Sequence, residues 1–157
     1  MKILAIDPGY ERLGIAIIEK ENKQKEYLIY SECFKTSRDF SHAERLGLIQ
    51  KKIEDIISKY KPEELAIETL FFTNNQKTAL LVAEARGVIM ATCQNAGLEI
   101  FEYGPGQIKL AITGHGKSDK TAVIKMIPLL IKIETEIKYD DEFDAIGIGL
   151  THFAIKK

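Results

Sequence analysis

Four acidic residues stand at positions from which a folded chain could bring their carboxylates together. Asp7 and Glu68 each end a short apolar run that predicts a buried strand, and Asp141 and Asp144 begin a helical segment three residues apart. A carboxylate directly after a buried strand costs folding free energy unless something pairs with it. If the two strands are parallel neighbours, both acids emerge at the same edge of the sheet. We therefore interpret these four residues as one catalytic and metal-binding site.

The chemistry of this donor set favours a hard cation. Four carboxylates without a cluster of His or Cys are typical of Mg²⁺ or Mn²⁺ sites and not of Zn²⁺ sites. Crowded carboxylates also repel one another unless cations neutralise them. Two ions about 4 Å apart can activate a water and stabilise the leaving oxygen of a phosphodiester. The pattern therefore predicts two Mg²⁺ ions per site, with Mn²⁺ as a substitute, and hydrolysis of a phosphodiester.

Simpler interpretations of the same acids stay open. Acids at a helix start are favoured by capping and by the helix dipole, which would account for Asp141 and Asp144 without metal. Glu68 alone could be a solvated strand end. Asp140 precedes Asp141, so a pair formed by Asp140 and Asp144, four residues apart, is an alternative set of ligands.

The periodicity of apolar residues predicts the elements that must position these acids. Strands are predicted at 2–7, 13–18, 27–35, 65–69 and 98–103, and helices at 41–60, 76–96, 105–112, 121–133 and 141–155. Short turns between the first three strands indicate an antiparallel meander. Pro128 is expected to kink or end its helix. The order of elements predicts one α/β domain over residues 1–157, with a five-stranded mixed sheet and helices on both faces.

The helix predicted at 76–96 is apolar on more than one of its faces, which predicts burial on two sides. One side would pack on the sheet. The other could pack on a second subunit, so we expect a homodimer.

Composition restricts the class of protein. The chain has 157 residues, a net charge of −1 and 45% hydrophobic residues, which fits a soluble globular domain and argues against nonspecific coating of nucleic acid. No apolar run approaches the roughly 20 residues that a membrane-spanning helix needs, and we find no signal peptide. Cys33 and Cys93 lack a CxxC partner, which favours a reduced, cytoplasmic protein.

An ordered series of short motifs resembles the RuvC family of Holliday junction resolvases and spans nearly the whole chain. The series is Asp7-Pro-Gly, Ala66-Ile67-Glu68, Phe71-Phe72 with Asn75, Ala85-Arg86-Gly87-Val88, Glu102-Tyr103-x-Pro105, Lys109, Thr113-Gly-x-Gly-Lys117, Lys120, Asp141-x-x-Asp144-Ala145 and Thr151-His152. This resemblance implies an RNase H-like fold, a homodimer and Mg²⁺-dependent nicking of two opposed strands at a four-way DNA junction. It also implies cooperation with the RuvA–RuvB branch-migration complex.

The resemblance also implies roles for single residues. Asp7, Glu68, Asp141 and Asp144 match the metal-binding catalytic acids of the family. Phe71 matches an aromatic residue that contacts a junction base, and an aromatic ring at such a position can stack on an unpaired base. Lys109 and Lys120 match lysines near the cleaved phosphate, and Lys117 is a further candidate for contact with phosphate. We interpret Phe72 as a core or loop anchor.

One turn departs from the family pattern, and two histidines have no functional role assigned. The turn Tyr10-Glu11-Arg12-Leu13 stands where many relatives have a Thr before the Gly, and its D-x-G-x-x-R-x-G pattern also resembles YqgF-type proteins. A YqgF-like nuclease acting on RNA or hybrids, or a non-catalytic module that binds branched DNA, are therefore the alternative functions. We expect His115 at the surface and His152 in the packed interior.

Overall fold

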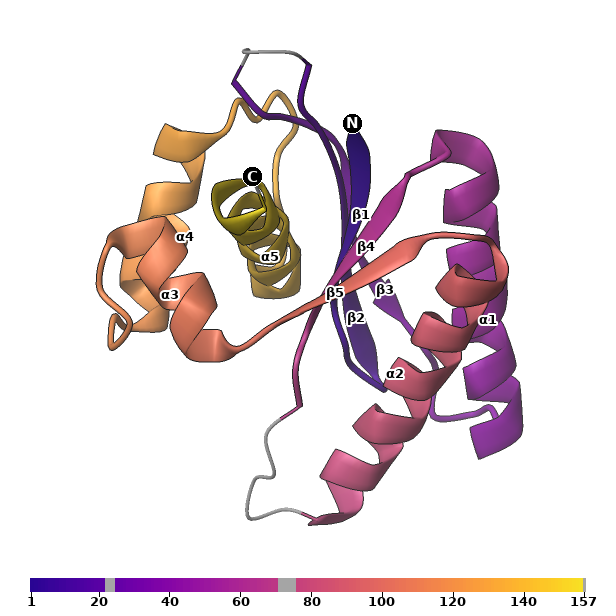
Figure 1. Cartoon of the computed structure of the whole chain (residues 1–157). Coiled ribbons are helices and arrows are strands. Elements are labelled where there is room, and N and C mark those ends of the chain that lie inside the picture. The colour runs from indigo at the N-terminus through magenta and orange to yellow at the C-terminus, as the bar shows by residue number, and fades with distance from the viewer. Residues whose placement is uncertain (22–24, 71–75, 157) are drawn as a thin grey trace.

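The computed structural model describes residues 1–21, 25–70 and 76–156 and contains a five-stranded sheet (Figure 1). The strands are β1 Lys2–Asp7, β2 Arg12–Glu19, β3 Tyr27–Lys35, β4 Glu64–Glu68 and β5 Glu99–Tyr103. Their order across the sheet is β3-β2-β1-β4-β5. The first three form an antiparallel meander, while β4 runs parallel to β1 and β5 parallel to β4. The predicted mixed sheet is confirmed.

Helices cover both faces of this sheet (Figure 1). Helices α1 His42–Tyr60 and α2 Gln76–Asn95 lie on one face, and α3 Pro105–Thr113, α4 Lys120–Leu130 and α5 Asp140–Ile155 lie on the other. The Ser41 side chain caps α1 by accepting a hydrogen bond from the Glu44 backbone. Helix α4 ends at Leu130, three residues earlier than predicted, because Pro128 in its last turn has no N–H to continue the ladder.

Two apolar clusters, one on each face, hold the layers together. Alternate residues of β1 serve both, because Leu4 and Ile6 pack toward α1 and α2 while Ile3 and Ala5 pack toward α3, α4 and α5. A strand buried on both faces needs a continuous apolar run, which explains the sequence Ile-Leu-Ala-Ile.

Helix α2 is buried on one side within the single chain. Ala85, Ile89 and Cys93 belong to the cluster between α1, α2 and the sheet, whereas Leu80 is 63% exposed. Among the residues that the structure describes, none therefore supplies the second buried side that the sequence predicts for this helix. Of the helices that the structure describes, none has the length and apolar character to cross a membrane.

A buried polar network ties the end of α5 to β4 and β5. His152 is fully buried, with Nε2 2.7 Å from Glu64 Oε2 and Nδ1 2.9 Å from the Tyr103 hydroxyl. Burial lowers the pKa of His152 more than the Glu64 carboxylate raises it. A neutral ring then donates to Glu64 and accepts from Tyr103. The prediction that His152 is internal is confirmed.

Helix α5 lies unusually close to β1 and β2 because a glycine faces them. A Cβ at Gly149 would lie 2.6 Å from Ile18 Cδ1 and 3.1 Å from Ala5 Cβ. Both neighbours are fully buried, so neither can move away without disturbing the core.

Replacing Gly149 with Ala should therefore destabilise the protein, by about 1–3 kcal/mol as for other overpacked cores. The matched control is Gly47→Ala in α1, where a Cβ meets nothing within 4 Å and the better helix propensity should stabilise by roughly 0.5–1 kcal/mol. Urea unfolding of both variants measures the difference. Equal stabilisation by the two alanines would contradict the close approach of α5.

Candidate active site

Asp7 and Glu68 lie side by side at the ends of two parallel strands. Ile6 of β1 pairs with Ile67 of β4 in the residues just before them, so the prediction that both acids share one edge is confirmed. The backbone at Glu68 is held from two directions. Thr69 N–H donates to the Tyr103 carbonyl at 2.9 Å, and Arg86 Nε of α2 donates to the Glu68 carbonyl at 3.1 Å.

The start of α5 lies over the same edge of the sheet. Gly14 is the register partner of Asp7, and a Cβ at Gly14 would lie 2.1 Å from the Asp141 carbonyl oxygen. Only a glycine leaves room for the helix backbone at this point. The Asp141 side chain is 21% exposed whereas that of Asp140 is 66% exposed, so Asp141 is directed inward and Asp140 outward.

Crowding of these acids changes their titration. Burial raises the pKa of Asp7 well above its ordinary value, the charges of Asp144, Glu68 and Asp141 raise it further, and Lys120 opposes them. Burial is also the first cause of the raised pKa of Glu68 and of Asp144. The Asp7 side chain shares a hydrogen bond with Glu68. Ionisation of these carboxyl groups is therefore unfavourable in the folded protein, and a bound cation would stabilise their charged forms.

Two cationic side chains pair with the acids of α5. Lys120 Nζ lies 2.7 Å from Asp144 Oδ2 and 3.8 Å from Asp140 Oδ2, and the Arg12 guanidinium forms an ion pair with Asp141. Within residues 1–21, 25–70 and 76–156, no three His, Cys, Asp or Glu side chains are clustered tightly enough to hold an ion. The donor set still fits a hard cation, because it consists of carboxylate oxygens that repel one another.

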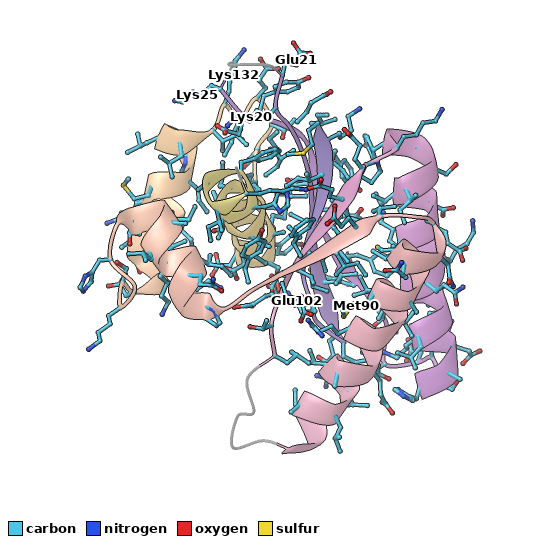
Figure 2. The ribbon with its side chains drawn as sticks, in the orientation of Figure 1. Lys20, Glu21, Lys25, Met90, Glu102 and Lys132 are labelled. Carbon is cyan, nitrogen blue, oxygen red and sulfur yellow. The ribbon has the colours of Figure 1, made fainter. Side chains whose placement is uncertain are left out.

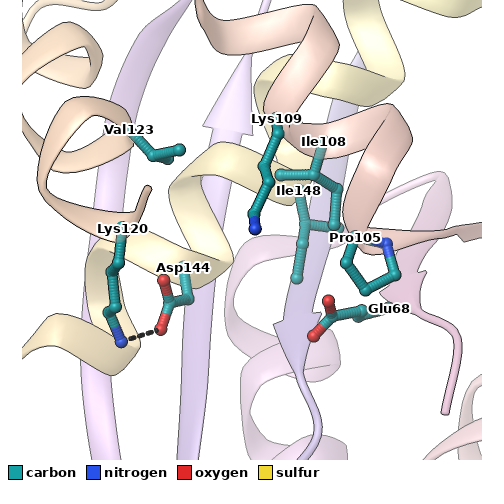
Figure 3. A pocket seen from close by; sticks show the side chains of 8 residues that line it. All are labelled: Glu68, Pro105, Ile108, Lys109, Lys120, Val123, Asp144 and Ile148. Carbon is teal, nitrogen blue, oxygen red and sulfur yellow. Dashed lines mark hydrogen bonds and ion pairs between the residues drawn. The ribbon is translucent and has the colours of Figure 1, made fainter. Parts of the chain in front are cut away.

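A cleft of about 280 Å³ opens beside the acids. Glu68, Asp144, Lys109 and Lys120 supply its polar lining, and Pro105, Ile108, Val123 and Ile148 supply its apolar lining. Figure 3 shows Lys109 reaching from α3 toward the space between Asp144 and Glu68, whereas Lys120 of α4 lies on the other side of Asp144 and pairs with it.

The remaining predicted site residues are placed as follows. Lys117 is exposed and does not line the cleft. His115 is exposed, as predicted. Phe71 and Phe72 lie outside the residues that the structure describes.

Sequence reasoning missed the contacts of two arginines. Arg12 stood out as a departure in the turn after Asp7, but its pairing with Asp141 links residues 129 positions apart, which no local pattern indicates. Arg86 appeared within a motif without a role. A basic residue near the middle of a largely apolar helix was the available signal for it.

Comparison with known proteins identifies the family. The family model described as "Crossover junction endodeoxyribonuclease RuvC" matches residues 3–152. A relative of that name from Caldicellulosiruptor saccharolyticus is 41% identical over 152 residues, which cover 97% of this chain and 92% of the relative.

Solved structures agree with this match. Thermus thermophilus RuvC in complex with a Holliday junction substrate has a TM-score of 0.90 and 31% identity, covering 98% of this chain and 93% of that one. The yeast mitochondrial Holliday junction resolvase Ydc2, at 14% identity and a TM-score of 0.70, supports the fold alone. The RNase H-like fold implied by the motifs is thus confirmed, and the chain belongs to the RuvC family of crossover junction endodeoxyribonucleases.

Proposed function

We propose that this protein is a metal-dependent endonuclease that resolves four-way DNA junctions by paired, symmetric nicks during recombination and repair. The convergence of Asp7, Glu68 and the start of α5 beside a cleft lined by Lys109 and Lys120 carries this proposal. The relative from Thermus thermophilus, solved with a Holliday junction substrate, supports the choice of DNA.

In this proposal Asp7, Glu68, Asp141 and Asp144 hold two Mg²⁺ ions per site, with Mn²⁺ as a substitute. Bound ions of this kind lower the pKa of a water and stabilise the leaving oxygen. The carboxylates must lose their protons to bind them, which their crowding otherwise opposes. Asp141 fits better than Asp140 as the ligand because its side chain is the less exposed of the two.

The lysines of the cleft would act on the substrate. Lys109 and Lys120 line the cleft beside the acids, which supports a role for both in binding the scissile phosphate and in offsetting the negative charge that develops in the transition state. Lys117 would contact phosphate farther from the cut, since it is exposed outside the cleft. Phe71 would stack on an unpaired junction base.

Two symmetric nicks require two active sites, which a two-fold homodimer supplies. The exposed Leu80 and the partly buried Leu81 and Val82 on α2 are consistent with a partner on that helix. We also propose cooperation with a RuvA–RuvB complex. A cytoplasmic location fits Cys33 and Cys93, which are both buried free thiols.

Replacing Asp7 with Asn should abolish cleavage while binding of the junction survives, because the variant loses a ligand charge but no DNA contact. Gel assays with a mobile four-way junction and Mg²⁺ measure both. Asp55→Asn is the matched control, since Asp55 pairs with Lys51 on the exposed side of α1. Nicking by Asp7→Asn at the wild-type rate would remove Asp7 from the site.

Substrate choice separates the proposal from its nuclease alternative. We expect the wild-type protein to cut a four-way DNA junction faster than an RNA–DNA hybrid of the same length. Parallel cleavage assays in Mg²⁺ and in Mn²⁺ test this. Equal or faster cleavage of the hybrid would favour a YqgF-like activity, and tight junction binding without any cleavage would favour a binding module.

The raised pKa of Asp7 predicts how stability depends on pH without metal. Between the ordinary pKa and the raised one, the folded protein holds a proton that the unfolded chain releases, so the free energy of unfolding falls as pH rises. The Asp7→Asn variant has no carboxyl group to titrate at this position, so its free energy of unfolding does not fall with pH for this reason. The variant should therefore be more stable than wild type at pH 7 in EDTA, and the two should converge near pH 3.

Thermal unfolding of both proteins from pH 3 to 8 measures the effect. Adding Mg²⁺ should stabilise wild type more than Asp7→Asn, because a ligand stabilises only the state that binds it. A lower unfolding temperature for Asp7→Asn than for wild type in EDTA at pH 7 would contradict the charge crowding.

A further inference from the structure

The edge of the sheet that carries the acids continues into two cationic residues. Arg12 begins β2 and is the register partner of Lys35, which ends β3. Gly14 of β2 pairs with Asp7 of β1, and β4 with Glu68 follows. Along one edge the chain therefore presents Lys35, Arg12, Asp7 and Glu68 in that order. The two cations flank the acids on the side away from the cleft of Lys109 and Lys120.

An aromatic ring holds both cations in place. Lys35 Nζ lies 3.9 Å from the centroid of the Tyr139 ring, and Arg12 Cζ lies 5.2 Å from the same centroid. A ring attracts a cation through its quadrupole but carries no net charge, so it fixes the ammonium without neutralising it. Lys35 is exposed, the Arg12 side chain is 47% exposed and Tyr139 is 37% exposed.

Arg12 retains binding capacity although it pairs with Asp141. A guanidinium carries five N–H donors, so one ion pair does not exhaust it. Its planar fork also suits phosphate oxygens.

Two lysines at the opposite end of the molecule are placed differently. Lys20 and Lys132 pair with Glu26 and Glu134 at 2.6 Å each. Figure 2 shows Lys20 and Lys132 at the end of the molecule where β2 finishes, away from the start of β2 that carries Arg12. Carboxylate partners cancel their charge, whereas the ring under Lys35 does not.

We propose that Lys35, Arg12 and Tyr139 form a subsite for the DNA backbone, on the β2–β3 side of the acids. Its ligand is the phosphodiester chain that flanks the cut, opposite the phosphates held by Lys109 and Lys120. The acids between them repel DNA, so cations on both sides are needed to hold a strand across the site. This subsite rests on the proposed function only in taking DNA as the ligand.

Replacing Lys35 with Gln should weaken binding of a four-way junction several-fold. It should also reduce the slope of log K against log salt by about 0.9, the value for one lost phosphate contact. The matched control is Lys59→Gln, because Lys59 lies 4.8 Å from the centroid of the Tyr60 ring and is exposed on α1, across the sheet. Its slope and affinity should equal those of wild type.

Binding is measured by fluorescence anisotropy in Ca²⁺ at several salt concentrations, with nicking followed on denaturing gels. Tyr139→Leu should weaken binding in the same direction as Lys35→Gln, since the lysine loses its platform. An unchanged slope for Lys35→Gln, or an equal decrease for both lysine variants, would overturn the subsite. Failure of wild type to cut the junction would refute the proposed function but leave this comparison of slopes intact.

Discussion

The close approach of α5 to β1 and β2 is the constraint on which the site depends. Two glycines permit it, Gly14 beneath the start of the helix and Gly149 farther along. Since Asp141 and Asp144 lie in the first turns of α5, any outward shift of this helix would separate them from Asp7. The same contact buries residues of β1, β2 and α5 in the apolar cluster on the face of the sheet that α3, α4 and α5 cover. The packing of α5 on β1 and β2 therefore forms the core and brings the acids together at the same time. The residues in contact here are more than 120 positions apart in the sequence.

The acids brought together in this way oppose folding. Burial and mutual repulsion raise the pKa of Asp7, so the site stores unfavourable free energy that a cation would release. Lys120 and Arg12 offset part of it by pairing with Asp144 and Asp141. In most of the chain the local sequence favours the folded state, whereas these acids oppose it. Functional residues are expected at such positions.

Local patterns predicted the elements well and the site in part. Asp7 and Glu68 could be joined from the sequence because each ends an apolar run, and parallel strand ends meet at one edge. The register of Asp7 with Gly14 could not be predicted in this way, because it depends on the geometry of the turn between β1 and β2. The inward direction of Asp141 could not be predicted either, because it depends on how α5 packs. The network of His152, Tyr103 and Glu64 joins three elements, and hydrophobic periodicity carries no information about such pairings. The junction-binding role of Phe71 stays a prediction.

The atypical turn after Asp7 is integrated into the fold. The Tyr10 carbonyl accepts from the buried Arg45 of α1, whose guanidinium also lies 3.8 Å from the Tyr10 ring centroid. Glu11 pairs with Arg38, and Arg12 pairs with Asp141. A Thr before Gly14 is thus not needed to fix this turn, because α1 holds one side and α5 the other. The departure from the family pattern leaves the position of Asp7 intact, since β1 and its pairing with Gly14 determine that position.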